Sequence, residues 1–119
     1  MIVRTFSVVH GGQRSTWLVT RLWELSRDLV PFEYAVADFT GLDRDCWFGD
    51  VHVPTIRSVL EHIARIEAAD LEHPIILGEN GEVMDGVHRI CKAWLRGRST
   101  LPAVRFATNP PPDIIEPAG

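Results

Sequence analysis

The sequence has little cysteine and no long apolar run. Its two cysteines, Cys46 and Cys91, form neither a CxxC pair nor a zinc-type spacing, which argues against a disulfide framework or a structural metal and predicts free thiols. No stretch approaches the ~18 apolar residues of a membrane span. The start, "MIVRTFSVVHGGQR", lacks the basic segment and apolar core of a signal peptide. These absences predict a cytoplasmic protein with no membrane partner.

Positive charge is also scarce. The chain has 12 Lys and Arg residues against 16 Asp and Glu residues, a net charge of −4. This balance argues against a protein that mainly coats nucleic acid. With 119 residues, 45% of them apolar and 24% charged, the chain has the length and composition of one globular domain.

Residues 1–31 are expected to form a strand and an amphipathic helix packed on the core. The segment "IVRTFSVV" is typical of a strand, and "HGGQRS" interrupts it. A helix is predicted from Ser15, its expected N-cap, to Pro31, which stops it. Its apolar side chains are Leu18, Leu22, Leu25 and Leu29, with Trp17 and Trp23 assigned to packing rather than to a cofactor.

A short strand is predicted at residues 32–38, followed by the polar loop "TGLDRDCWFGD". In this loop Trp47 and Phe48 either cover the edge of the core, the favoured reading, or stack on a base. At the other end of the chain, the proline-rich residues 107–119 are predicted to be a flexible tail.

The segment "PTIRSVLEHIARIEAAD" predicts a second helix, with Pro54 in its first turn. Thr55, Ser58 and His62 follow one another at i, i+3 and i+7, so they share a flank and could reach one ligand. The alternative is that they only border solvent. The apolar stripe expected to face the core consists of Ile56, Val59, Leu60, Ile63 and Ile66.

A β-hairpin is predicted next, with residues 74–78 paired with 82–84 around an Asn-Gly turn. It delivers the chain to Asp85, the expected N-cap of a helix that begins at Gly86 and ends at Gly97. Cys91 falls in the buried stripe of that helix, where burial suppresses the reactive thiolate. A last strand follows at "TLPAVRF".

The start of this helix is a candidate anion site. Free amide N–H groups and the helix dipole favour an anion there, and Gly86, His88 and Arg89 would bind it, most plausibly as a phosphate. The dipole should also lower the pKa of His88. Arg89 could instead form a salt bridge with Asp85. Four cations near this helix form either a phosphate patch or a solvated face: Arg89, Lys92, Arg96 and Arg98.

The order strand, turn, strand, glycine motif, helix, glycine, strand over "PIILGENGEVMDGVHRICKAWLRGRSTLPAVRF" resembles the ParB/sulfiredoxin-like superfamily. The resemblance covers about residues 32–106 and is carried by Gly86, His88, Arg89 and Ala93. It implies an α+β fold with a mixed, short-stranded sheet flanked by helices, to which this chain adds an N-terminal strand and helix. It also implies nucleotide phosphates bound at Gly86, His88 and Arg89, with Thr55, Ser58 and His62 lining the same pocket.

Three branches of the superfamily bear on function. Sulfiredoxins place a catalytic cysteine where this chain has Val87, which argues against sulfinic-acid reduction. Partition proteins add a DNA-reading domain after the point where Phe106 stands. The closest motif belongs to nucleotide-dependent kinases of free serine, which read much like "DGVHR". Their catalytic carboxylate has no clear counterpart here, although Asp43 and Asp45 are candidates by location.

The sequence therefore predicts a nucleotide-phosphate-binding domain that takes ATP, ADP or CTP with Mg²⁺. It could transfer phosphate to a small-molecule acceptor, with Asp85 as general base or magnesium ligand. No metal-ligand set is predicted. The alternative is a non-catalytic regulatory or interaction module, a homodimer through the tryptophan-bearing first helix. A weaker alternative is a DNA-binding or nuclease-like protein.

Overall fold

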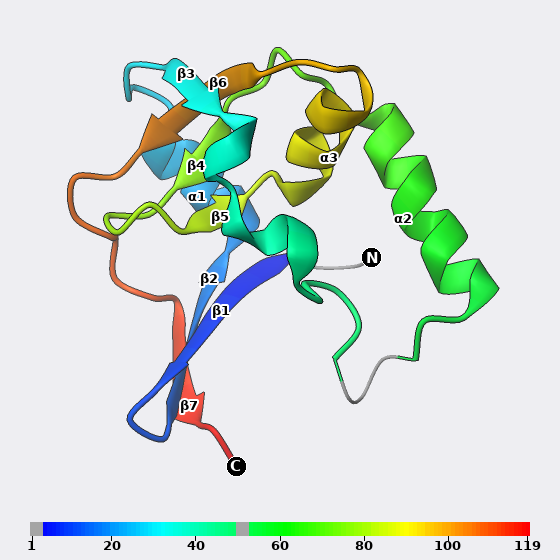
Figure 1. The fold of residues 1–119 in the computed structure, drawn as a ribbon. Coiled ribbons are helices and arrows are strands. Elements are labelled where there is room, and N and C mark those ends of the chain that lie inside the picture. Colours follow the sequence, from blue (N-terminus) through cyan, green and yellow to red (C-terminus); the bar gives the residue numbers. More distant parts are fainter. Residues whose placement is uncertain (1–3, 50–52) are drawn as a thin grey trace.

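The computed structural model describes residues 4–49 and 53–119. It shows an α+β domain with two sheets and three helices (Figure 1). Ile2 and Val3 of the first predicted strand, and Asp50 of the predicted loop, lie outside the described residues. The elements are β1 (Thr5–His10), β2 (Gln13–Leu18), α1 (Val19–Ser26), β3 (Phe32–Ala35), two short 3₁₀ turns (Val36–Asp38 and Thr40–Asp43), α2 (Ile56–Ala68), β4 (Ile75–Leu77), β5 (Val83–Asp85), α3 (Val87–Leu95), β6 (Thr100–Arg105) and β7 (Ile114–Pro117).

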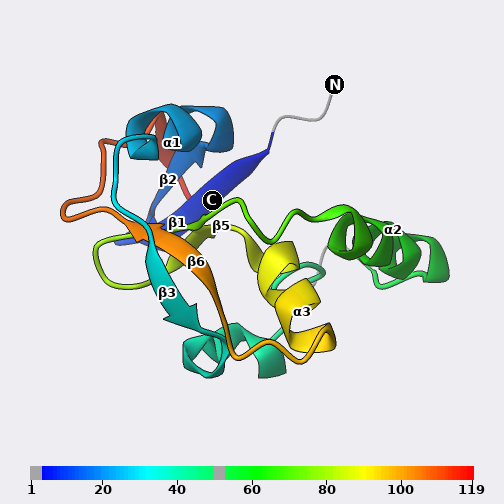
Figure 2. The ribbon, with the colours of Figure 1, turned by 90° about the horizontal axis from the view of Figure 1, so that it is seen from above.

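A mixed four-stranded sheet forms the centre of the molecule, in the order β3-β6-β4-β5. Strands β4 and β6 are parallel, and the two outer pairs are antiparallel. Because neighbouring side chains of a strand point to opposite faces, Ile75 and Leu77 pack with Ile90 of α3, whereas Ile76 packs with Leu22 of α1. The sheet therefore lies between α3 on one face and the N-terminal elements on the other (Figure 2).

The N-terminal segment differs from its prediction. Residues 13–18 form β2, so the predicted helix begins only at Val19, and Ser15 is not its cap. Gly11 and Gly12 both have positive φ, 59° and 77°, and this backbone makes the tight turn that folds β2 back onto β1. Since β2 pairs with β1 on one side and β7 on the other, strand hydrogen bonds outweigh the helical spacing of the leucines.

The C-terminal segment was predicted as a flexible tail, and this is wrong for residues 114–117, which form β7 against β2. Two hydrogen bonds also hold the residues that precede β7. The Trp17 indole N–H donates to the carbonyl of Pro110 at 2.7 Å, and the Leu18 amide donates to the Asp113 carboxylate at 2.8 Å. These contacts hold the proline-rich segment across the start of α1.

Helix α2 has the predicted position but not the predicted burial. Thr55 is its N-cap, with its hydroxyl accepting from the Ser58 amide at 3.1 Å, and Pro54 lies just before the cap. Of the predicted apolar stripe, only Ile66 is buried in the core. Helix α3 is the neighbouring element that packs against α2, and α2 otherwise stands at the edge of the molecule (Figures 1 and 2).

The predicted hairpin and the helix after it are confirmed: β4 pairs antiparallel with β5, and α3 follows at Val87. Helix α3 ends at Leu95 with Arg96 as its C-cap, and the φ of 70° at Gly97 allows the Arg98 amide to donate to the Ala93 carbonyl at 2.9 Å. In the described part of the chain, no helix has the length and apolar character needed to cross a membrane.

Candidate functional site

Asp85 is the buried centre of a hydrogen-bonded cluster at the end of β5. Its side chain is only 2% exposed, and both carboxylate oxygens accept hydrogen bonds. One accepts from the Arg4 guanidinium at 2.9 Å, and the other accepts from the Trp23 indole N–H at 2.8 Å and from Arg89 at 2.7 Å. Asp85 thus joins three separate segments. The prediction that it caps α3 is wrong, because Gly86 holds the N-cap position.

Arg89 is held on two sides. Besides its bond to Asp85, its other terminal nitrogen donates to the backbone carbonyls of His73 at 3.0 Å and Pro74 at 2.7 Å. Its side chain is 14% exposed. The salt bridge that the sequence offered as the alternative for Arg89 is therefore present, and most of its hydrogen-bonding capacity is used to position the helix start.

Gly86 lets α3 begin close against the sheet. Its φ of 122° lies outside the range of ordinary side chains. A Cβ built on it would clash with the Ile75 side chain, lying 2.7 Å from the Ile75 Cβ. No side chain caps the first turn of α3, so the N–H groups of that turn keep the positive partial charge that favours an anion.

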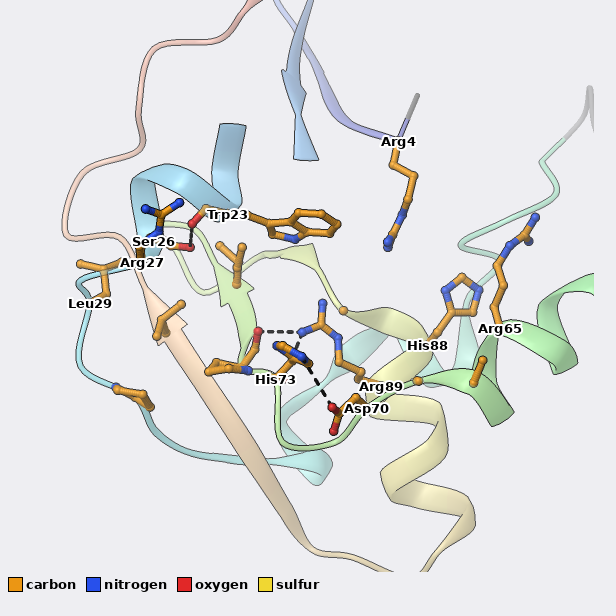
Figure 3. Close-up of a pocket in the computed structure, with 17 residues that line it drawn as sticks. Arg4, Trp23, Ser26, Arg27, Leu29, Arg65, Asp70, His73, His88 and Arg89 are labelled. Carbon is orange, nitrogen blue, oxygen red and sulfur yellow. Dashed lines mark hydrogen bonds and ion pairs between the residues drawn. The ribbon is translucent and has the colours of Figure 1, made fainter. Parts of the chain in front are cut away.

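A cavity of about 1020 Å³ opens beside this cluster, between α1, the end of α2 and the start of α3 (Figure 3). Gly86 and Trp23 lie in its wall, and Asp70 is the carboxylate there. Beside apolar side chains such as Leu29, Ile76 and Val104, the wall holds positive or protonatable side chains from four stretches of the chain, namely Arg4, Arg27, Arg65, Arg89, His73 and His88. Because the four arginines share one concave surface, their positive potentials add and favour an anionic ligand.

His88 connects the cavity to an aromatic stack. Its Nε2 lies 2.9 Å from Nδ1 of His62, a hydrogen-bond distance. The Trp47 ring stacks on both imidazoles, with centroids 4.2 Å from His62 and 5.1 Å from His88. Trp47 therefore lies on the two histidines, and a base cannot stack on that face of it in this arrangement.

Burial and the neighbouring positive charges of His62, Arg65 and Arg4 lower the pKa of His88 to about 4. Burial also lowers the pKa of His62. The direction for His88 is the one predicted, but its leading cause is desolvation rather than the helix dipole. Near pH 7 the imidazole of His88 is thus neutral and can donate one hydrogen bond while accepting another.

The structure brings only His62, of the three predicted residues on α2, next to His88. Thr55 caps the helix, and the Ser58 hydroxyl donates to the Thr55 carbonyl at 2.9 Å. Neither residue lines the cavity. Both hydroxyls therefore form hydrogen bonds at the N-terminus of α2.

The two loop carboxylates proposed by location lie away from the cavity wall. Asp45 organises its own loop, accepting from the amides of Trp47, Phe48 and Gly49 at 3.1, 2.7 and 2.6 Å. These backbone hydrogen bonds lower the pKa of Asp45. Asp43 lies exposed in a 3₁₀ turn. Asp45 is therefore the residue that shapes the loop carrying Trp47.

The four cations around α3 do not form one patch. Arg89 donates to Asp85, His73 and Pro74. Lys92 donates to the carbonyls of Glu67 at 2.8 Å and Ala69 at 2.6 Å, in the last turn and at the C-cap of α2. Lys92 thus complements the negative end of that helix. Arg96 and Arg98 are exposed near the end of α3, far along the helix from Gly86.

Sequence reasoning missed Arg4, Trp23, Arg27 and Arg65 as cavity residues. Arg4 precedes β1, Trp23 and Arg27 lie in α1 and at its C-cap, and Arg65 lies in α2, so no short motif links them. Trp23 was assigned to packing, yet it is 47% exposed and faces the cavity (Figure 3). Only tertiary structure brings these segments together.

Comparisons with protein-family models, with curated proteins and with solved structures found no match to this chain. Within residues 4–49 and 53–119, no group of three or more His, Cys, Asp or Glu side chains is arranged to hold a metal ion. Evidence for function therefore comes from the geometry and charge of the cavity itself.

Proposed function

We propose that the cavity beside Asp85 binds a nucleotide through its phosphate groups. The observation that carries the proposal is the convergence of four arginines and the uncapped N-terminus of α3 on one concave surface. Arginine and free helix N–H groups are the protein's preferred phosphate ligands. The resemblance of the glycine motif at Gly86 to that of ParB/sulfiredoxin-like domains supports the same assignment.

The phosphates are assigned to the end of the cavity formed by Gly86, His88 and Arg65. Gly86 and His88 place the first turn of α3 at this end, and Arg65 stands beside His88 (Figure 3). Arg4 borders the same end. One of its terminal nitrogens bonds Asp85, but its side chain is 56% exposed, so its other donors can meet a ligand. Arg89 acts in this scheme as a positioning residue, because its donors hold Asp85 and two carbonyls.

The base is assigned to Trp23. The indole N–H bond to Asp85 fixes the ring, and Arg4 lies 5.9 Å from its centroid. An indole ring held in this way is a ready surface for stacking, which tolerates any base. The cavity volume of about 1020 Å³ lies at the upper end of the range for ligand sites, roughly 300 to 1,000 Å³, so a nucleoside triphosphate fits. ATP, ADP and CTP are the probes for choosing among bases.

Magnesium would arrive with the nucleotide, coordinated mainly by phosphate oxygens and water. Asp85 lies beside the cavity and has both carboxylate oxygens engaged. Asp70 lies in the cavity wall and its side chain is 58% exposed, while its carboxylate accepts from the Glu72 amide at 2.9 Å and lies 3.5 Å from His73 Nε2. If the protein transfers phosphate to a small molecule, as the serine-kinase resemblance suggests, Asp70 is better placed than Asp85 to accept the acceptor's proton. Loss of turnover in Asp70→Asn with unchanged nucleotide binding would support that role.

Two-dimensional amide NMR tests the binding. ATP, ADP and CTP, each with Mg²⁺, are titrated into the protein, and tripolyphosphate and adenosine are titrated separately. We expect the nucleotides to shift the amides of residues 86–89 and the indole N–H of Trp23. Tripolyphosphate should shift the first group, and adenosine the second. If no amide near Gly86 moves at ~5 mM nucleotide, the proposal is wrong.

A further inference from the structure

An apolar stripe on α2 faces solvent rather than the core. Ile56, Val59, Leu60 and Ile63 are 82%, 39%, 56% and 44% exposed. Single exposed aliphatic residues are common, but a contiguous set marks an interaction surface. The helix stands at the edge of the molecule beside α3 (Figures 1 and 2), so no other described helix or strand covers the stripe. We call these four residues the α2 stripe.

The charge of α2 argues against nucleic acid and anionic membranes as partners of the α2 stripe. The helix carries two arginines, Arg57 and Arg65, and two glutamates, Glu61 and Glu67, so its net charge is zero. A neutral helix has no electrostatic attraction for nucleic acid or for an anionic membrane. Arg57 and Glu61 together line a shallow groove with Ile56, Leu60 and Ala64. The groove thus combines apolar side chains with one charge of each sign, as a self-complementary surface does.

We propose that the α2 stripe binds the α2 stripe of a second copy of this chain, with the two helices antiparallel. At 100° per residue, Arg57 and Glu61 lie on one flank of the line through Leu60, and Val59 and Ile63 lie on the other. A two-fold axis between antiparallel helices sets each flank against itself. Arg57 of each copy then meets Glu61 of its partner, and the apolar flanks meet each other. A parallel pair would set the charged flank against Val59 and Ile63, so the antiparallel pair is favoured.

The geometry of α2 also predicts that the dimer is weak and that it leaves the ligand cavity open. Ala64 lets two helices approach closely at the groove. A single 13-residue helix makes a small interface, and interfaces below about 1,200 Å² bind weakly. Arg65 and His62 lie on the side of α2 away from Leu60, so the dimer leaves the ligand cavity open. This inference does not depend on nucleotide binding.

Sedimentation equilibrium of charge-reversal variants tests the proposal. Arg57→Glu places two glutamates against each other at both ends of the interface, and Glu61→Arg places two arginines there. We expect each variant alone to dimerise about tenfold more weakly than wild type. An equimolar mixture of the two restores opposite charges in trans and should regain the wild-type affinity. Glu33→Arg on β3, which also reverses one exposed charge, is the matched control and should leave the affinity unchanged.

Loss of fold cannot imitate this pattern, because two misfolded variants would not rescue each other. Three results would overturn the proposal. They are a wild-type protein that stays monomeric up to ~1 mM, a mixture that dimerises no better than either variant alone, and an equal loss of affinity in Glu33→Arg. In the first case the stripe belongs to a different partner.

Discussion

Replacing Asp85 by Asn separates a structural from a catalytic role for this carboxylate. The Asn side chain has nearly the same shape, but it removes the negative charge that Arg4 and Arg89 share. It also turns one acceptor oxygen into an NH₂ donor, which then faces a donor of Arg4, Trp23 or Arg89. At least one of the three hydrogen bonds is therefore lost, and a donor–donor contact replaces it.

The expected loss of stability in Asp85→Asn follows from the burial of the Asp85 side chain. Removing one partner of a buried ion pair costs about 3–5 kcal/mol, and the 2% exposure of Asp85 places it in this class. The Arg4 side chain is 56% exposed, so it can form hydrogen bonds with water instead. Its lost bond to Asp85 therefore contributes little to the loss of stability. The Arg89 pair, with 14% and 2% exposure, dominates. We expect Asp85→Asn to lower the free energy of unfolding by about 2–4 kcal/mol, counting the retained shape of the side chain.

Urea unfolding followed by circular dichroism gives this number from the transition midpoint. Glu116→Gln is the matched control. Its partner Arg14 lies 3.9 Å away, and the two side chains are 45% and 51% exposed, so the variant should stay within about 0.5 kcal/mol of wild type. An Asp85→Asn protein as stable as the control would refute the structural role and return Asp85 to the list of catalytic candidates.

Three further outcomes are expected. Gly86→Ala should destabilise the protein by more than about 3 kcal/mol, measured by urea unfolding, because the new methyl group meets Ile75 at a φ closed to alanine. Because the pKa of His88 is lowered to about 4, the unfolded chain takes up its proton first. Stability is then full above pH 6.5 and falls towards pH 4, by about 1 kcal/mol between pH 7 and 5 after allowing for partial exposure, and His88→Gln should flatten that slope. Burial raises the pKa of Cys91, so mass spectrometry should find the exposed Cys46 alkylated well before it; equal rates would contradict the burial of Cys91.

The segment from β4 to β6 could be predicted because its signals are local. The Asn-Gly turn, the glycine break and the helical spacing up to Gly97 lie within about thirty residues, and each acts on its neighbours alone. The structure agrees with the predicted hairpin and helix there. The α+β class was implied by the family resemblance that these same elements carry, and the structure shows that class.

The rest depends on distant partners. Residues 13–18 carry helical leucine spacing in part, but pairing with β1 and β7 makes them a strand, and β7 comes from a proline-rich segment near the end of the chain. The cavity has the same origin, since Arg4 and Arg65 approach His88 only in the fold. The exposure of the α2 stripe was not foreseen either, because amphipathic spacing shows that a face is apolar and not what covers it.

Equilibrium dialysis with labelled ATP and Mg²⁺ tests the phosphate assignment most directly, with wild type compared with Arg65→Ala and Arg96→Ala. Both variants remove one exposed arginine, but only Arg65 lines the cavity, whereas Arg96 follows the far end of α3. The account predicts saturable binding to wild type, a loss of about fivefold to tenfold in Arg65→Ala, and no change in Arg96→Ala. Absence of binding to wild type, or equal losses in the two variants, would contradict it.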